Sequence, residues 1–229
     1  MILDIVPSNI DDKKIRRAVR KLEEGALLAL PTDTSWSIVC SIKSPSAIKK
    51  LRMLSGERDE RHFTLLCSGI SQFSETCFLD NTRFRLINRL SPGPYVFILK
   101  SQSGTSKVLD IRRNEVGVRI PDHPVPISLI KTLDHPLYSI TAKRSMTRGG
   151  NDEWKYAGEE TGEAFLRAAL AAPIPEDELF ESGWELEAIE ELDLILDSGE
   201  ERERIFSTIL DLTEEEVKVL RRGAGAWPV

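Results

Sequence analysis

Two patterns of hydrophobic and polar positions alternate along the chain. Short, nearly continuous apolar runs predict buried strands at residues 2–6, 26–30, 36–42, 63–67, 95–100, 116–121 and 137–141. Apolar residues spaced three or four apart predict amphipathic helices over 11–25, 44–54, 81–90 and 124–133. The alternation indicates an α/β (α+β) fold, with helices on the faces of a sheet.

The pattern changes after about residue 144. A further helix is predicted over 159–172, and the stretch that follows, 173–191, is strongly acidic and predicted to be helical. Apolar runs then return three times, and we expect these strands to rejoin the sheet; they occupy 192–199, 206–213 and 217–223. The chain of 229 residues is therefore predicted to be a single domain, 1–229, with an acidic helical insertion at about 150–191.

The formal net charge of −6 conceals a division between the two parts of the chain. Residues 1–150 hold 24 Lys and Arg against 15 Asp and Glu, whereas residues 151–229 hold 7 against 22. The first part, at +9, is of the kind that attracts phosphates or nucleic acid. The second part, at −15, either repels such partners or folds back over the basic face. The alternative is that both parts are simply solvated faces.

Composition excludes several classes of protein. No apolar run approaches the roughly 20 residues needed to span a bilayer, so we expect no membrane association and a cytoplasmic location. The three cysteines are single, without CxxC spacing, and are expected to be buried reduced thiols; neither a disulfide framework nor a structural metal is predicted. Motifs for P-loop, dinucleotide-binding and HExxH zinc chemistry are absent from the sequence. His123 and His135 each precede a proline and are interpreted as turn residues.

Six segments, in order, resemble the YrdC/YciO superfamily. They are "LPTDTSWSIVC", "FTLLC", "SPGPYVFILK", "VGVRIPDHPV", "LDLILDSG" and "STILDLTEEEVKVLRRGAG". The resemblance covers about residues 5–143 and 192–226, and details such as "HFTLLC" and "PGPYVFILK" are similar to the YciO branch. It implies an open, twisted sheet of mixed parallel and antiparallel strands with flanking helices and a concave, positively charged face.

The resemblance also implies a class of function. The better studied branch makes threonylcarbamoyl-AMP from threonine, bicarbonate and ATP for the threonylcarbamoyladenosine modification of tRNA, and members have been described as binding double-stranded RNA and tRNA. Such chemistry needs cations against the triphosphate and a cation for the amino acid carboxylate. ATP with Mg²⁺ is the cofactor that the resemblance implies.

The family pattern suggests a role for each matching residue of this chain. Thr32 would face the amino acid and Arg119 would bind its carboxylate, while Ser207, Thr208 and Arg221 would lie near the nucleotide. Each has a plainer alternative: Thr32 only caps its loop, Arg119 forms a structural ion pair, Ser207 and Thr208 are ordinary strand residues, and Arg221 with its neighbour is a solvated edge.

The chain departs from the synthase pattern at two places. Ser55 and Glu57 stand at the two basic positions of the Lys-x-Arg motif, with Arg58 one residue out of register, and Thr141 and Lys143 replace Ser-x-Asn. Arg58 is therefore included only as a candidate nucleotide contact. These changes favour a protein that binds a nucleotide or RNA over an active synthase, which remains the alternative. A third hypothesis is a scaffold whose acidic insertion meets a basic partner. The sequence leaves the oligomeric state open.

Overall fold

One ten-stranded sheet organises the computed structural model, which describes residues 1–55, 64–102, 115–147 and 175–227. The strands are Ile2–Asp4 (β1), Leu28–Leu30 (β2), Ser37–Ser41 (β3), Thr64–Leu66 (β4), Tyr95–Lys100 (β5), Glu115–Arg119 (β6), Leu137–Thr141 (β7), Leu194–Asp197 (β8), Thr208–Asp211 (β9) and Lys218–Arg221 (β10). Their order in the sheet is β1-β8-β2-β3-β7-β4-β6-β5-β9-β10. Non-consecutive neighbours show that chain segments far apart in sequence are joined side by side.

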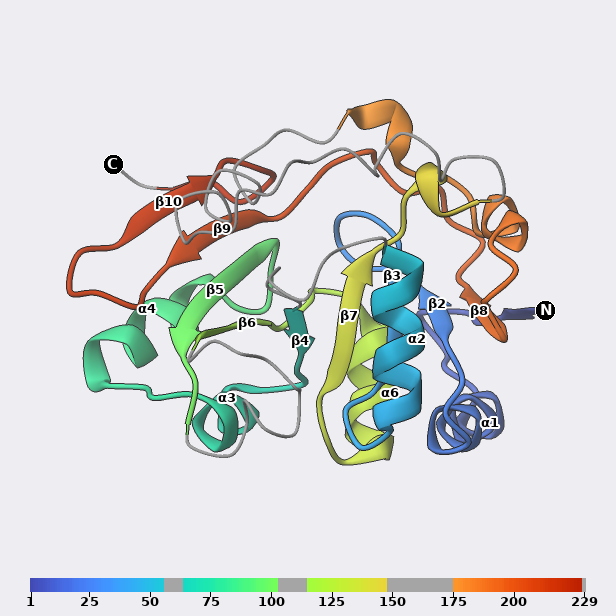
Figure 1. The fold of residues 1–229 in the computed structure, drawn as a ribbon, viewed down its shortest axis with the longest axis horizontal. Coiled ribbons are helices and arrows are strands. Elements are labelled where there is room, and N and C mark those ends of the chain that lie inside the picture. The colour runs from blue at the N-terminus through green and yellow to red at the C-terminus, as the bar shows by residue number, and fades with distance from the viewer. Residues whose placement is uncertain (56–63, 103–114, 148–174, 228–229) are drawn as a thin grey trace.

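The sheet is mixed, as predicted. Parallel pairs join β1 to β8, β2 to β8, β4 to β6 and β5 to β9, whereas the other neighbours are antiparallel. Figure 1 shows β9 and β10 at the opposite side of the molecule from β8 and the N-terminus. All three late strands therefore rejoin the sheet, although at two distant positions.

Helices cover both faces of the sheet. Their bounds are Asp12–Glu23 (α1), Pro45–Ser55 (α2), Ile70–Thr76 (α3), Asn81–Leu90 (α4) and Pro124–Leu133 (α6). Neighbouring residues of β3 show the two layers: Val39 packs into the core beneath α1 and α6, and Ile38 packs into the core beneath α2. Because successive strand side chains point to opposite faces, one buried strand serves both cores.

The four helices predicted between residues 11 and 133 are confirmed as α1, α2, α4 and α6. Asp11 caps α1 by accepting from the backbone N–H of Lys13, and Asp80 caps α4 by accepting from that of Arg83. The structure adds α3, which the sequence pattern did not predict because its seven residues show no clear helical period. The strands predicted from apolar runs are also confirmed.

The acidic segment differs from the prediction within its described part. Residues 175–191 contain two short 3-10 helices, Glu176–Glu178 (η3) and Gly183–Ala188 (η4), and no α-helix. Four of its apolar side chains are buried and pack it against the body of the protein: Leu179, Phe180, Leu186 and Ile189. The predicted helix at 159–172 lies outside the described residues, and the single-domain assignment stays a prediction.

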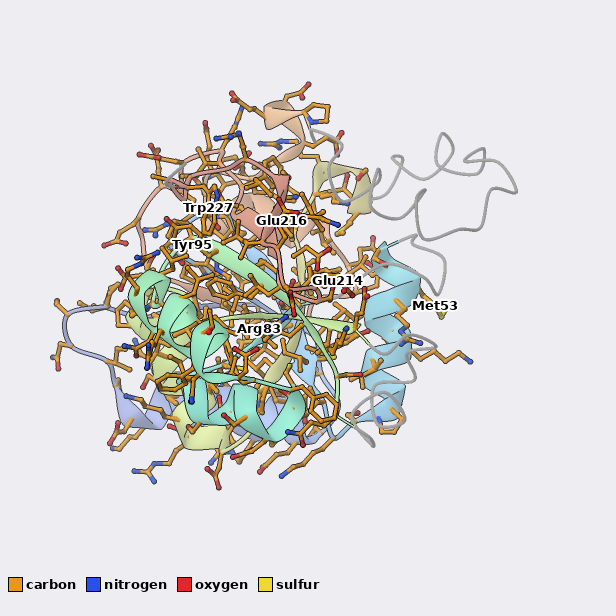
Figure 2. The ribbon with its side chains drawn as sticks, turned by 90° about the vertical axis from the view of Figure 1, so that its left-hand side faces the viewer. Met53, Arg83, Tyr95, Glu214, Glu216 and Trp227 are labelled. Carbon is orange, nitrogen blue, oxygen red and sulfur yellow. The ribbon has the colours of Figure 1, made fainter. Side chains whose placement is uncertain are left out.

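Two side chains attach the C-terminal part to the sheet. Arg83 of α4 donates from Nε to the carbonyl of Leu212 at 2.6 Å and from Nη2 to that of Glu214 at 2.8 Å. The hydroxyl of Tyr95 donates to the carbonyl of Ala226 at 2.7 Å. Figure 2 shows Arg83 below Glu214, and Tyr95 near Trp227. These bonds fix both the turn after β9 and the segment after β10.

All three cysteines are buried and free, as predicted. Burial raises the pKa of Cys40 to about 12 and that of Cys77 to about 11, and it also raises the pKa of Cys67. Because the thiolate is the reactive species, we expect none of the three to react with a disulfide reagent at pH 8 while the protein is folded. Titration in denaturant should then release three thiols. A rapidly reacting thiol in the native protein would contradict this prediction.

Candidate functional site

Arg119 is the centre of the candidate site. It ends β6, its side chain is 6% exposed, and its guanidinium contacts residues from two other parts of the chain. Nη2 forms an ion pair with Asp33 Oδ1 at 2.6 Å, and Nη1 donates to Thr34 Oγ1 at 3.0 Å and to Ser207 Oγ at 2.6 Å. Two loops and a strand end therefore meet on one buried cation.

The loop after β2 holds its own shape through Thr32. The hydroxyl of Thr32 donates to the carbonyl of Ser35 at 2.7 Å and accepts from the backbone N–H of Thr34 at 3.2 Å. Thr32 is fully buried. Its side chain is thus engaged within the loop, and Thr34 and Asp33 make the contacts with Arg119.

Ser207 joins two arginines. Its hydroxyl accepts from Arg119, while its carbonyl accepts from Arg221 Nε at 3.2 Å and Arg221 Nη2 at 3.0 Å. The Arg221 guanidinium also lies 4.9 Å from the centre of the Phe206 ring. Ser207 therefore accepts hydrogen bonds from both Arg119 and Arg221.

Thr208 forms its hydrogen bonds with the segment after β10, unlike Ser207. Its hydroxyl donates to the carbonyl of Gly225 at 2.7 Å and accepts from the N–H of Gly223 at 2.9 Å. A Cβ on Gly223 would stand 2.2 Å from the carbonyl oxygen of Phe206, so the turn requires glycine there. Thr208 thus anchors the turn that follows Arg221.

Within the part of the chain that the structure describes, the site holds two arginines and one paired carboxylate. Burial lowers the pKa of Arg119, and the Asp33 carboxylate opposes that shift. Burial and then the charge of Arg119 lower the pKa of Arg221 to about 10. Among the described residues, Asp33 pairs with Arg119 and no carboxylate pairs with Arg221. Of the two neighbouring guanidinium groups, only that of Arg119 is paired with a described carboxylate.

His123 borders the site. It caps α6, where its Nδ1 accepts from the backbone N–H of Val125 at 3.3 Å, which leaves the proton of the neutral ring on Nε2. Burial first, and then the charge of Arg202, lower its pKa to about 4, while Glu200 and Asp33 act in the opposite direction. The interpretation of His123 as a turn residue is thus incomplete, since the side chain is buried beside the site.

A connection from the far side of the sheet also reaches the site. Arg202, between β8 and β9, donates from Nη1 to the carbonyl of Thr32 at 3.1 Å and from Nη2 to Glu200. Sequence reasoning missed Arg202 because "EERER" reads as an ordinary solvated run of charges. No local signal in the sequence distinguishes this arginine from its neighbours.

The described part of the acidic segment folds back onto basic residues. Glu185 pairs with Arg144, and Glu181 pairs with Arg204 at 3.0 Å. The indole of Trp36 donates to the carbonyl of Glu181 at 3.1 Å. Of these two pairs, only Glu185–Arg144 joins the acidic part of the chain to residues 1–150, because Arg204 itself lies in the acidic part.

A pocket of about 450 Å³ has His123 in its lining. The start of α3, the end of α4 and the connection from β6 to α6 line it, with Ile70, Ile120 and Ile127 as its main apolar side chains. His123 is thus one of the residues that line this pocket.

The structure brings together four of the six predicted site residues. Arg119, Ser207 and Arg221 are in contact, and Thr32 lies in the loop that contacts Arg119. Thr208 is adjacent but engaged elsewhere, and Arg58 lies outside the described residues. Of the residues at the altered motif positions, Ser55 ends α2 and Thr141 ends β7, while Glu57 lies outside the described residues.

The comparison with protein families decides the relationship. The family model Sua5_yciO_yrdC, described as "Telomere recombination", matches residues 20–155, more than half of the chain. This chain belongs to the Sua5/YciO/YrdC family. The uncharacterized protein YciO of Escherichia coli K12 is 28% identical over 222 residues, which cover 96% of this chain and 94% of YciO. The threonylcarbamoyl-AMP synthase of Mus musculus is 29% identical over 131 residues, covering 57% of this chain and 46% of the synthase.

Solved structures of family members share the fold. The crystal structure of E. coli YciO matches with a TM-score of 0.77 at 25% identity and covers 99% of this chain and 97% of YciO. The structure of P. abyssi Sua5 complexed with L-threonine matches with a TM-score of 0.76 at 22% identity, covering 97% of this chain and 57% of Sua5. The resemblance to the family, and to an open sheet of this kind, is therefore confirmed.

Two further observations concern the described residues alone. None of their helices is both long and apolar enough to cross a bilayer. No group of three or more His, Cys, Asp or Glu side chains among them is arranged to hold a metal ion.

Proposed function

We propose that this member of the family binds a nucleotide, together with a small carboxylate-bearing ligand, at the site around Arg119 and Arg221. The observation that carries the proposal is the unequal pairing of the two arginines: Asp33 pairs with Arg119, whereas Arg221 has no carboxylate partner among the residues that the structure describes. A positive charge withdrawn from water is costly unless an anion joins it. Nucleotide phosphates are anions of the kind that arginine side chains bind by paired hydrogen bonds.

The proposed roles follow the family pattern, adjusted to the contacts. Arg221 would bind a phosphate, and Arg119 would bind the ligand carboxylate in exchange for part of its contact with Asp33. Ser207 would hold the two guanidinium groups in register, while Thr32 would shape the loop. Mg²⁺ would arrive on the phosphates of ATP, which commonly supply most of its non-water ligands. Arg58 remains a candidate phosphate contact.

The test is calorimetric titration with ATP, with and without Mg²⁺, on the wild type and two matched variants. Arg221→Gln should weaken ATP binding at least tenfold, since a charged hydrogen bond in a partly dry site contributes about 1.5 to 3 kcal/mol. Arg222→Gln removes the adjacent, exposed arginine and should change affinity less than twofold. Absence of ATP binding by the wild type, or equal losses in both variants, would overturn the proposal.

Active threonylcarbamoyl-AMP synthesis is the alternative at the same site. The mouse relative carries that name, and Arg119, Ser207 and Arg221 are retained in this chain. The Lys-x-Arg and Ser-x-Asn positions are altered, and this removes cations from the phosphate side. Pyrophosphate release that requires both threonine and bicarbonate would establish the synthase. Traces that stay flat at millimolar threonine would leave binding as the function.

RNA binding, to double-stranded RNA or tRNA, is the second form of the binding hypothesis. Its support is the +9 excess of residues 1–150, and its weakness is that the acidic segment already pairs with one of these basic residues, through Glu185 and Arg144. Binding through several phosphates should weaken by about 0.7 to 0.9 log units per tenfold salt for each phosphate. A salt-insensitive affinity would exclude this form. A cytoplasmic location accords with both forms and stays a prediction.

A further inference from the structure

The connection between β8 and β9, residues 198–207, is defined here as the strap. Six strands of the sheet lie between β8 and β9, so the strap has to cross the sheet to join them. Figure 1 shows this red and orange segment passing above β3 and β7 toward β9. It carries Arg202 to the Thr32 loop before it delivers Ser207 to Arg119.

Arg202 is held firmly at one end of its guanidinium. Its side chain is 12% exposed, and its Nη1 donates to the carbonyl of Thr32 at 3.1 Å. The backbone N–H of Arg202 donates to the carbonyl of Glu181 at 2.8 Å, which fixes the strap itself. The guanidinium is therefore positioned before any ligand arrives.

The other end of Arg202 is held weakly. Nη2 pairs with Glu200, whose side chain is 54% exposed, and Nε is buried without a hydrogen-bond partner. An ion pair with a solvated carboxylate contributes only about 0 to 1 kcal/mol, so an incoming anion exchanges with Glu200 at little cost. A phosphate offers several acceptor oxygens where Glu200 offers one contact.

Other unpartnered polar atoms lie around the same loop. Asp33 Oδ2, Arg119 Nε and His123 Nε2 are buried without hydrogen-bond partners. Arg202 and Asp33 both act electrostatically on His123, and Asp33 is bonded to Arg119, so these groups are neighbours. Buried polar atoms are nearly always hydrogen-bonded in native proteins, and this concentration is typical of a place that receives a polar ligand.

We infer that Arg202 is a phosphate-binding residue of the proposed nucleotide site, and that Glu200 occupies its guanidinium until the phosphate replaces it. The inference rests on the proposed function. Arg202 would thus provide a cation for the phosphates in a chain that lacks the two basic residues of the Lys-x-Arg motif and carries Ser55 and Glu57 instead. Opening the Glu200 pair would add a second uncompensated positive charge to that of Arg221, which matches a polyphosphate better than a single carboxylate.

The experiment measures the affinities of ATP and of inorganic tripolyphosphate for the full chain and four variants. Arg202→Gln should weaken both ligands by about tenfold or more, corresponding to at least 1.4 kcal/mol. Arg202→Lys keeps the charge without the planar fork and should fall between Arg202→Gln and the wild type. Glu200→Gln should tighten binding by up to about fivefold, because it removes the competing carboxylate.

Arg204→Gln is the matched control. Arg204 lies on the same strap, but its guanidinium pairs with Glu181, and among the described residues no hydrogen bond or ion pair joins it to the Thr32 loop. This variant should bind ATP as the wild type does. Thermal melting of all four variants identifies any loss of folding, and the exposed Glu200→Gln change tests the inference independently of Arg202 stability.

The outcomes separate the inference from the proposed function. If the wild type binds ATP and Arg202→Gln binds it equally well, the inference is wrong and the proposed function stands. If Glu200→Gln weakens binding, the carboxylate is not a competitor and the inference is also wrong. If the wild type binds neither ATP nor tripolyphosphate, the proposed function itself fails.

Discussion

Replacement of Arg119 by methionine is expected to lower the free energy of unfolding by about 3 to 5 kcal/mol. Arg119 and Asp33 form a pair whose side chains are 6% and 12% exposed. Methionine keeps the apolar stem but leaves the Asp33 carboxylate buried without its cation, and removal of one partner from such a pair costs that much. Equilibrium unfolding in urea measures the loss.

A second substitution tests whether the unpaired Asp33 carboxylate causes the loss of stability in Arg119→Met. Asp33→Asn in the Arg119→Met background removes the stranded charge and should recover roughly half or more of the loss, because the buried carboxylate accounts for most of the penalty. Arg222→Met is the control, since that arginine is exposed, and should change stability by less than about 0.5 kcal/mol. A loss below 1 kcal/mol in Arg119→Met would show that the pair is solvated rather than buried.

Acidification is the second large perturbation, and His123 is its expected target. The pKa of His123 is lowered from 6.5 to about 4 in the folded protein, chiefly by burial. Between these values the unfolded chain binds a proton that the folded chain does not, so the free energy of unfolding falls as pH falls. The stabilisation is complete above pH 6.5 and is lost progressively toward pH 4. The whole shift corresponds to somewhat more than about 3 kcal/mol, of which roughly 2 to 3 kcal/mol is lost between pH 6.5 and pH 4.

His123→Asn separates this effect from the titration of carboxylates. Asparagine also caps helices well, so α6 keeps an acceptor for the N–H of Val125, but it does not titrate. The wild type should therefore lose about 2 to 3 kcal/mol more than the variant between pH 6.5 and pH 4, measured by urea unfolding at each pH. Parallel pH curves for the two proteins would mean that His123 is protonated without cost in the fold.

Local pattern determined most of the secondary structure. The apolar runs and the three- to four-residue spacings are properties of short segments, and ten strands and four helices follow from them. The pattern did not predict the helix α3, because only Phe73 and Thr76 of its seven residues are buried. The described acidic segment forms short 3-10 helices instead of the predicted α-helix. Its apolar side chains are buried against the rest of the protein; they are Leu179, Phe180, Leu186 and Ile189.

The order of family segments led us to predict that Arg119, Ser207 and Arg221 belong to one site, and the structure shows that Ser207 contacts both arginines. The partners of these residues were decided only by the tertiary structure. Asp33, Thr34 and Ser207 meet Arg119 across 86, 85 and 88 residues of sequence, and Arg202 meets Thr32 across 170. Such contacts depend on which strands lie side by side and where the strap crosses them. No short stretch of sequence contains that information, because strand order is set by packing of the whole sheet.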